Sequence, residues 1–129
     1  MENLKIRTKK YALRIIKLFI SLPKTPEAQI IGKQILRSGT SVGANYSESY
    51  RARSDNEFVA KINIALQELE ETLYWLELIL EGKISDSTEE IKFLQKETDE
   101  LIAIFVTIIN KINKGRRMKV QGRRMKDEG

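Results

Sequence analysis

Residues 54–82, SDNEFVAKINIALQELEETLYWLELILEG, carry the signals for both ends and the buried face of one long helix. Ser54 and Glu57 form a capping-box pattern, in which each side chain accepts a hydrogen bond from the other residue's free backbone N–H. Side chains that can face a core then recur every three or four residues, as one side of a helix requires; they are Phe58, Ile62, Ala65, Leu69, Thr72, Leu76 and Ile79. Because glycine often ends helices, we expect this helix to stop at Gly82.

The sequence on the C-terminal side repeats the arrangement. Ser87-Thr-Glu-Glu90 is a second capping box. A second stripe follows at helical spacing and consists of Ile91, Leu94, Thr98, Leu101, Phe105, Ile108 and Ile112. We expect this helix to end at Gly115.

The N-terminal side predicts two more helices. One occupies residues 25–53, because Thr25 suits an N-cap and Pro26 suits the first helical position; its stripe is Ile31, Ile35, Ser38, Val42, Asn45, Ser49 and Ala52. The other occupies residues 4–22 and ends before Pro23; its stripe is Leu4, Thr8, Tyr11, Ile15, Leu18 and Leu22. No run alternates as a strand would. Short turns between four helices predict an all-α fold, an antiparallel up-down-up-down four-helix bundle over residues 1–114.

Residues 25–53 are unusual for a bundle helix because small and polar residues occupy core-facing positions. Each mid-helix glycine costs about 1 kcal/mol relative to alanine, so Gly39 and Gly43 need a packing reason. We expect them to admit a bulky neighbour, Trp75 or Tyr74, while Asn45 bonds across the core and sets the register. The alternative is a polar cavity lined by Ser38, Ser41, Asn45 and Glu48.

The composition excludes several kinds of chemistry. The chain has no cysteine and no histidine, so thiolate nucleophiles and the commonest general base and transition-metal ligand are missing. Adjacent glutamates on helices point in different directions and are expected to be solvated. We therefore expect no metal, no cofactor and no enzymatic activity. The N-terminus lacks a signal-peptide pattern and the longest apolar run, 101–109, is too short to cross a membrane, which predicts a cytoplasmic protein.

Some apolar residues lie outside the stripes and predict self-association. A helix that is apolar beyond one stripe is buried on more than one side, and a bundle of this size offers a second side only through another subunit. We expect a homo-oligomer whose interface contains Tyr74, Trp75, Leu78, Ile102, Val106 and Ile109.

The charges are unevenly distributed along the chain. Residues 1–53 hold 11 basic and 3 acidic side chains, whereas residues 54–114 hold 6 basic and 13 acidic ones. This pattern fits two differently solvated helix pairs, a basic face for phosphates, or opposite faces that attract neighbouring copies. In residues 115–129, Gly-Arg-Arg-Met-Lys occurs twice, seven residues apart. We expect a flexible basic tail that adds phosphate contacts or keeps the oligomer soluble.

The basic residues are the candidates for binding RNA or DNA. Their contacts would be mainly to phosphates and hence tolerant of sequence. The candidates are Lys5, Arg7, Lys9, Lys10, Arg14, Lys17, Arg37, Arg51, Arg53, Arg116, Arg117, Lys119, Arg123, Arg124 and Lys126. The alternative is a scaffold whose basic surface docks an acidic protein partner.

Residues 34–80 resemble a known family. The resemblance is carried by Arg37-Ser38, Ser41-Val42, Asn45, Glu48, the Arg51-Ala-Arg-Ser54 turn, Glu57-Phe58 and the Glu71-Thr-Leu-Tyr-Trp-Leu run. This combination is similar to the bacterial ribosomal RNA intervening-sequence proteins, relatives of the accessory variability determinant of diversity-generating retroelements. The resemblance implies a four-helix bundle assembled as a barrel-shaped pentamer, without established enzymatic activity, and kinship with a basic pentamer that binds nucleic acid and a reverse transcriptase.

Overall fold

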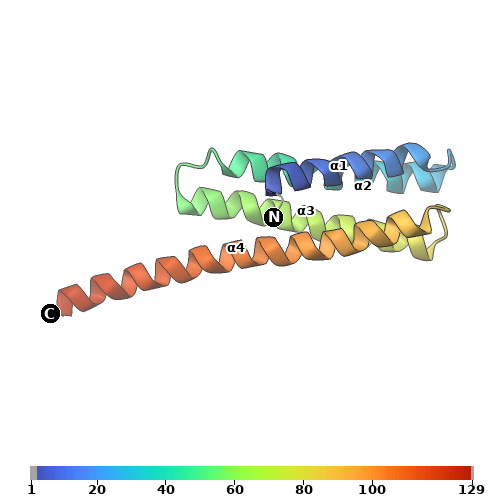
Figure 1. Cartoon of the computed structure of the whole chain (residues 1–129). Coiled ribbons are helices and arrows are strands. Elements are labelled where there is room, and N and C mark those ends of the chain that lie inside the picture. The colour runs from blue at the N-terminus through green and yellow to red at the C-terminus, as the bar shows by residue number, and fades with distance from the viewer. Residues whose placement is uncertain (1–2, 129) are drawn as a thin grey trace.

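The computed structural model describes residues 3–128, and the side chains of these residues except 120, 121 and 123–128. The described chain contains four helices, and no strand occurs within it. The helices are α1 (Leu4–Ser21), α2 (Pro26–Ser49), α3 (Asp55–Glu81) and α4 (Thr88–Glu128). Consecutive helices are antiparallel neighbours, and α4 returns beside α1 (Figure 1). The predicted all-α, up-down-up-down four-helix bundle is confirmed.

The ends of α3 follow the predicted signals with one difference at each end. At the start, the Glu57 N–H donates to Ser54 Oγ over 3.1 Å, but the Glu57 carboxylate accepts from the Arg53 N–H and not from that of Ser54. At the other end Gly82 is the C-cap with a helical φ of −78°, and Lys83 takes the left-handed conformation with φ 53°. Gly82 is nevertheless required, because a Cβ there would lie 2.8 Å from the Leu78 carbonyl oxygen.

The core consists of the predicted stripes, with a shift in α2. The predicted positions Ile35, Ser38, Val42 and Ser49 are buried, but α2 also buries Ala28, Gly32, Gly39 and Tyr46. Tyr46 takes the core position next to Asn45, and its ring stacks on that of Phe105 with 5.7 Å between the centroids. The 3.6-residue helical repeat drifts against a strict seven-residue pattern, which accounts for the one-residue shift along the helix.

The glycines of α2 face α1, which corrects the expectation that they face Trp75 or Tyr74. A Cβ at Gly39 would lie 2.8 Å from Cγ1 of Ile15, and one at Gly43 would lie 3.1 Å from Oγ1 of Thr8. The close approach therefore brings the α1 and α2 backbones together.

A layer of hydroxyl groups crosses the core, with one residue from each helix. Tyr11 and Thr98 are hydrogen-bonded through their side-chain oxygens at 2.6 Å, and Thr72 Oγ1 donates to Ser38 Oγ at 2.8 Å. All four residues are buried. Burial raises the pKa of Tyr11 above its ordinary value.

Asn45 does not take part in this layer, so its predicted bond across the core is wrong. Its amide donates to the Ser41 carbonyl of its own helix at 2.9 Å, because the shifted face of α2 leaves Asn45 at the edge of the core. Two residues of the alternative polar cavity have other partners. Ser41 Oγ donates to the Arg37 carbonyl, and Glu48 pairs with Lys61 on α3.

α4 does not end at Gly115, and the predicted break there is wrong. The helix continues through both glycines to Glu128 and projects beyond the other three helices (Figure 1). No glycine in the described part of the chain has a positive φ, and Arg116, Arg117, Met118 and Lys119, which lie between the two glycines, are good helix formers. The expected flexible tail is therefore an extension of α4. Among the described apolar side chains, Ile108 and Ile109 are the last of α4 to pack against the core.

None of the described helices combines the length and the apolar character that a membrane span requires.

Candidate nucleic-acid interface

Arg7 and Arg14 belong to ion pairs that join α1 to α4. Arg7 makes two hydrogen bonds to Glu97, at 2.9 and 2.5 Å, and a third to Glu100 at 2.7 Å. Arg14 binds both carboxylate oxygens of Glu90, at 2.8 and 2.7 Å. The hydrogen bonds to Glu97 and to Glu90 raise the pKa values of Arg7 and Arg14, respectively. Such two-point contacts to a carboxylate are geometrically specific.

Two further arginine contacts hold the bundle together. The Arg14 guanidinium lies over the Phe93 ring, 3.7 Å from its centroid, as in a cation–π contact. Arg37 joins α2 to α3 through Glu68, at 3.1 Å, and through Glu71. A phosphate would have to displace carboxylates from Arg7, Arg14 and Arg37. The structure thus gives three predicted nucleic-acid residues a role inside the protomer.

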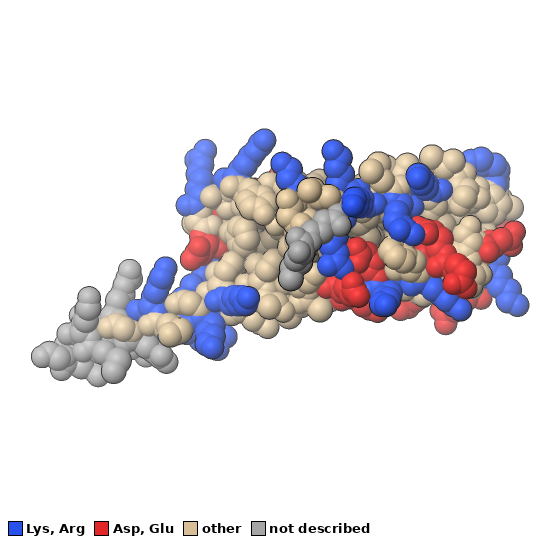
Figure 2. All heavy atoms as spheres, in the orientation of Figure 1, with Lys and Arg blue, Asp and Glu red and all other residues tan. Residues whose placement is uncertain are grey.

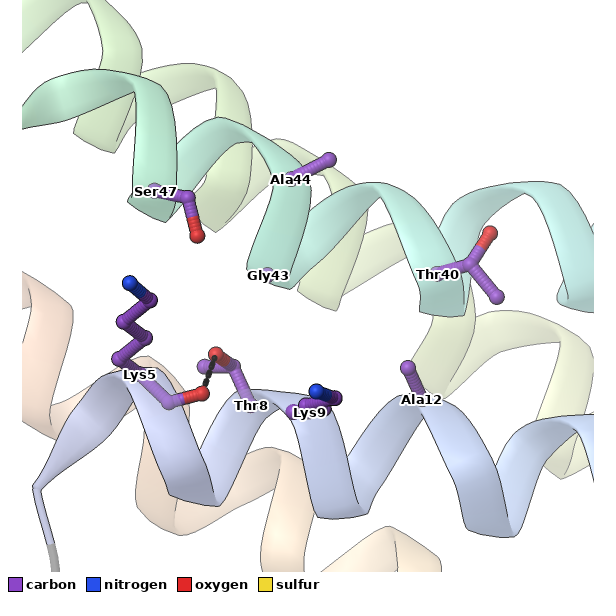
Figure 3. Close-up of a pocket in the computed structure, with 8 residues that line it drawn as sticks. All are labelled: Lys5, Thr8, Lys9, Ala12, Thr40, Gly43, Ala44 and Ser47. Atoms are coloured by element: carbon purple, nitrogen blue, oxygen red, sulfur yellow. Dashed lines mark hydrogen bonds between the residues drawn. The ribbon is translucent and has the colours of Figure 1, made fainter.

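Lys5 and Lys9 line a groove on the outer surface between α1 and α2, which has a volume of about 310 Å³. Figure 3 shows both lysines on α1, opposite the α2 residues of the same groove. The remaining lining side chains are small: Thr8, Ala12, Thr40, Gly43, Ala44 and Ser47. Thr8 Oγ1 donates to the carbonyl of Leu4 at 2.7 Å and to that of Lys5 at 3.3 Å. The groove therefore has a shallow floor with cationic groups at its rim.

A second hollow of about 310 Å³ continues this groove toward the end of α2. It shares Lys5 and Ser47 with the first and adds Glu48, Tyr50 and Arg51. Glu48 accepts a hydrogen bond from Lys61 at 2.7 Å, and this bond lowers the pKa of Glu48. Arg51 and Arg53 are exposed in the turn that follows α2. The structure thus brings Lys5, Lys9 and Arg51 to one continuous surface, which we call the α1/α2 groove.

The other predicted cations lie elsewhere. Lys10 and Lys17 are exposed on the outer side of α1. In the α4 extension Arg117 and Lys119 are exposed and Arg116 is half-buried, whereas the side chains of Arg123, Arg124 and Lys126 lie outside the described part of the structure. On the face shown in Figure 2, basic side chains spread over α1 and the extension, and acidic side chains gather near the start of α4.

The predicted interface residues are not buried in the protomer. Tyr74 is 52% exposed and Val106 is 38% exposed. Trp75, Leu78, Ile102 and Ile109 are half-buried. Tyr74 and Trp75 make an edge-to-face contact with ring centroids 5.1 Å apart.

Sequence reasoning missed a second set of exposed apolar residues. On α1 these are Ile6, Leu13 and Ile20, which are 48%, 51% and 66% exposed. Their spacing of seven residues is visible in the sequence, but it runs out of phase with the α1 core stripe.

Metal chemistry has no support in the described residues, where no group of three or more His, Cys, Asp or Glu side chains could hold a metal ion.

Comparisons with known proteins agree with the fold. The sequence model of a family described as 23S rRNA-intervening sequence protein matches residues 3–107. A solved structure from Bacteroides thetaiotaomicron, described as a protein of unknown function from the S23 ribosomal protein family, is 36% identical, with a TM-score of 0.77. The match covers 83% of this chain and 98% of that one. No curated protein matches the chain. The chain thus belongs to the 23S rRNA-intervening sequence protein family.

Proposed function

We propose that this protein is a non-enzymatic, homo-oligomeric bundle, assembled as a pentamer, that binds nucleic acid through lysine and arginine contacts to phosphates. The observation that carries the proposal is the charge of α1. This helix has six basic residues and no acidic one, and Lys5 and Lys9 line the α1/α2 groove without any ion pair among those found in the described residues. The groove offers phosphates a cationic rim over mostly small, uncharged side chains, and the carboxylate that also lines it, that of Glu48, is paired with Lys61.

The chemistry of the groove fits backbone contacts better than base recognition. Lysine is a point charge on a flexible stem, so it attracts phosphates without demanding a particular geometry. Tyr50 is the one aromatic residue that lines the groove where it is described, which gives bases little to stack on. Several copies in one oligomer would present several grooves to one strand, and multivalency would raise the overall affinity.

The test is fluorescence anisotropy with labelled RNA and DNA across a salt series. Each phosphate contact contributes about 0.9 to the slope of log affinity against log salt on duplex DNA, so Lys5→Gln/Lys9→Gln should lower that slope by about two. Lys92→Gln/Lys96→Gln removes the same charge from exposed positions on α4 and should leave the slope unchanged. No affinity at low salt, or affinity indifferent to salt, would overturn the proposal and favour an acidic protein partner, such as a reverse transcriptase.

Assembly is tested separately by sedimentation velocity. The exposed Tyr74 and Val106 and the half-buried Ile102 and Ile109 support burial against another subunit. We expect one species heavier than the monomer. A monomer at micromolar concentration would remove the oligomeric part of the proposal and leave the nucleic-acid part to be judged by its own assay.

A further inference from the structure

The outer side of α1 carries an apolar stripe that nothing in the protomer covers. Ile6, Leu13 and Ile20 follow one another at intervals of seven residues. At 3.6 residues per turn such residues stay within about 40° of one another around the helix. The buried residues of α1 are Thr8, Tyr11, Ile15 and Leu18, which lie on the opposite side of the helix. The stripe therefore points directly away from the core.

The surroundings of the stripe are basic. Lys9 flanks it on one side and Lys10 and Lys17 on the other, and all three are exposed. The stripe therefore has three large aliphatic side chains, each about half exposed, aligned on one helix and bordered by cations. This alignment indicates a contact surface, because single exposed apolar residues scattered over a protein would not align.

The outer side of α3 complements the α1 stripe, because it combines an exposed aromatic residue with acidic side chains. Tyr74 is 52% exposed and points away from the buried residues of α3. The segment 62–82 contains five glutamates and no basic residue. Arg37 engages Glu68 and Glu71, whereas Glu70, Glu77 and Glu81 are exposed around Tyr74.

We infer that the α1 stripe of one copy packs against the outer side of α3 of the next copy, so that the chain assembles head to tail. The inference rests on the self-association in the proposed function and names the two surfaces. Pairing α1 with α1 would bring lysines together, and pairing α3 with α3 would bring glutamates together. The contact between α1 and α3 instead joins opposite charges around aliphatic and aromatic side chains.

The position of the two helices explains why the contact joins different copies. α1 and α3 lie diagonally across the bundle, with no close approach of their backbones, so their outer sides face opposite directions (Figure 1). A contact between two different surfaces of the same chain is heterologous, and it closes into a ring when each copy is rotated by a constant angle relative to the last. Lys9 belongs both to the α1/α2 groove and to the border of the stripe, so the groove lies beside the proposed contact.

Site-specific cross-linking tests the inference directly, because the chain has no cysteine of its own. In a protein that carries both Leu13→Cys and Tyr74→Cys, a short bismaleimide should produce a ladder of covalent oligomers. Each single variant should produce none, because neither surface meets itself. The matched control is Ile30→Cys/Tyr74→Cys, in which the first residue is equally apolar and 65% exposed but lies on α2; it should produce no ladder.

The outcomes separate this inference from self-association in general. The head-to-tail contact is wrong if sedimentation shows an oligomer but the double variant gives no ladder. It is also wrong if Tyr74→Cys alone gives a covalent dimer. In both cases the protein still self-associates, through other surfaces. If the wild type is monomeric, both fall. The wild-type monomer could instead float with vesicles that contain phosphatidylglycerol, and the Leu13→Gln variant could fail to do so. This result would identify a lipid surface as the partner of the stripe and overturn the inference.

A polar substitution gives an independent check. Leu13→Gln should weaken the assembly at least tenfold, whereas Ile30→Gln should not change it. Both residues are more than half exposed, so neither change should unfold the bundle, and circular dichroism verifies this. Assembly of Leu13→Gln at wild-type strength would count against the stripe as an interface.

Discussion

Tyr11 and Thr98 show how single polar side chains can be accommodated in the core of this bundle. Their hydroxyl groups are buried and joined at 2.6 Å, and Thr98 Oγ1 also donates to the Leu94 carbonyl of its own helix. A buried polar group is tolerated when it is hydrogen-bonded, and removing one partner costs more than removing both. The same logic applies to Ser38 and Thr72 on the other two helices.

A double-mutant cycle should expose this coupling. Thr98→Val leaves the Tyr11 hydroxyl short of a partner and should lower the free energy of unfolding by about 1–3 kcal/mol. Adding Tyr11→Phe to Thr98→Val should cost less than the sum of the single changes. Urea denaturation gives the free energy of unfolding of the wild type, the two single variants and the double variant. Additive effects would show that the two hydroxyl groups are not coupled.

Alkaline unfolding should report on Tyr11 as well. Because burial raises the pKa of Tyr11, the folded state holds its phenolic proton more tightly than the unfolded state, in which the pKa is about 10. The stabilisation is fully present below pH 10 and is lost as the pH rises above it. Tyr11→Phe should flatten the fall in stability above pH 10. An unchanged alkaline profile would contradict this prediction.

Gly39 lies where α1 and α2 approach closely, so an added side-chain atom at this position should disturb their packing. A Cβ there would lie 2.8 Å from Cγ1 of Ile15, inside contact distance, so Gly39→Ala should destabilise the bundle by about 1–3 kcal/mol. Gly115→Ala is the matched control, because no atom lies within 4 Å of its added Cβ. It should raise helicity without destabilising. Equal effects at both positions would rule out crowding as the cause.

At the scale of the helix, the extension of α4 differs from the rest of the bundle. It has two glycines, and its six cations among residues 115–126 repel one another where they are three or four residues apart. Helices without tertiary contacts are only marginally stable in water. We therefore expect this basic helical arm to depend for its order on charge screening or on an anionic partner.

Removing residues 118–129 tests the arm. The described contacts of the core end before it, so the free energy of unfolding should change by less than about 0.5 kcal/mol. The salt slope of nucleic-acid binding should fall, because cations are lost. In the full chain, helicity should rise with added salt or duplex. A large loss of stability on truncation would mean that the arm packs against the body.

At the scale of the whole molecule, the basic residues of the N-terminal half fall into two groups: some form ion pairs within the protomer, and others stay on its surface. Within one protomer, Arg7 and Arg14 join the basic α1 to glutamates in the first part of α4, and Arg37 joins α2 to a glutamate of the acidic α3. Lys5, Lys9 and Arg51 remain at the α1/α2 groove. Arg7, Arg14 and Arg37 thus hold helices together, whereas Lys5, Lys9 and Arg51 take part in none of the ion pairs found in the described residues.

Arg7→Gln should separate these two roles. Both Arg7 and Glu97 are about one-fifth exposed, so losing the charged hydrogen bonds should lower the free energy of unfolding by about 1–3 kcal/mol. The salt slope of nucleic-acid binding should stay at the wild-type value, in contrast to Lys5→Gln/Lys9→Gln. A reduced slope with unchanged stability would assign Arg7 to phosphate binding.

Local patterns determined most of the fold. Caps such as Ser54, the proline after Leu22 and the apolar stripes depend only on residues three or four apart, so they could be read without knowing which helices meet. The same reasoning missed the true end of α4, because a glycine allows a helix to end but does not force it to, and the backbone at Gly115 stays helical. It also placed Asn45 in the core, since the drift of α2 depends on its packing against α1.

The sequence alone determined four helices, their order and the charge that each one carries, because these follow from spacing along one chain. Only the tertiary structure decided which charged side chains form ion pairs within the protomer. Arg7 and Glu97 are 90 residues apart in the chain yet hydrogen-bonded, whereas Lys9, on the side of α1 toward α2, lines the α1/α2 groove. The partner of a side chain on a helix is set by the helix that packs beside it, and no local pattern contains that information.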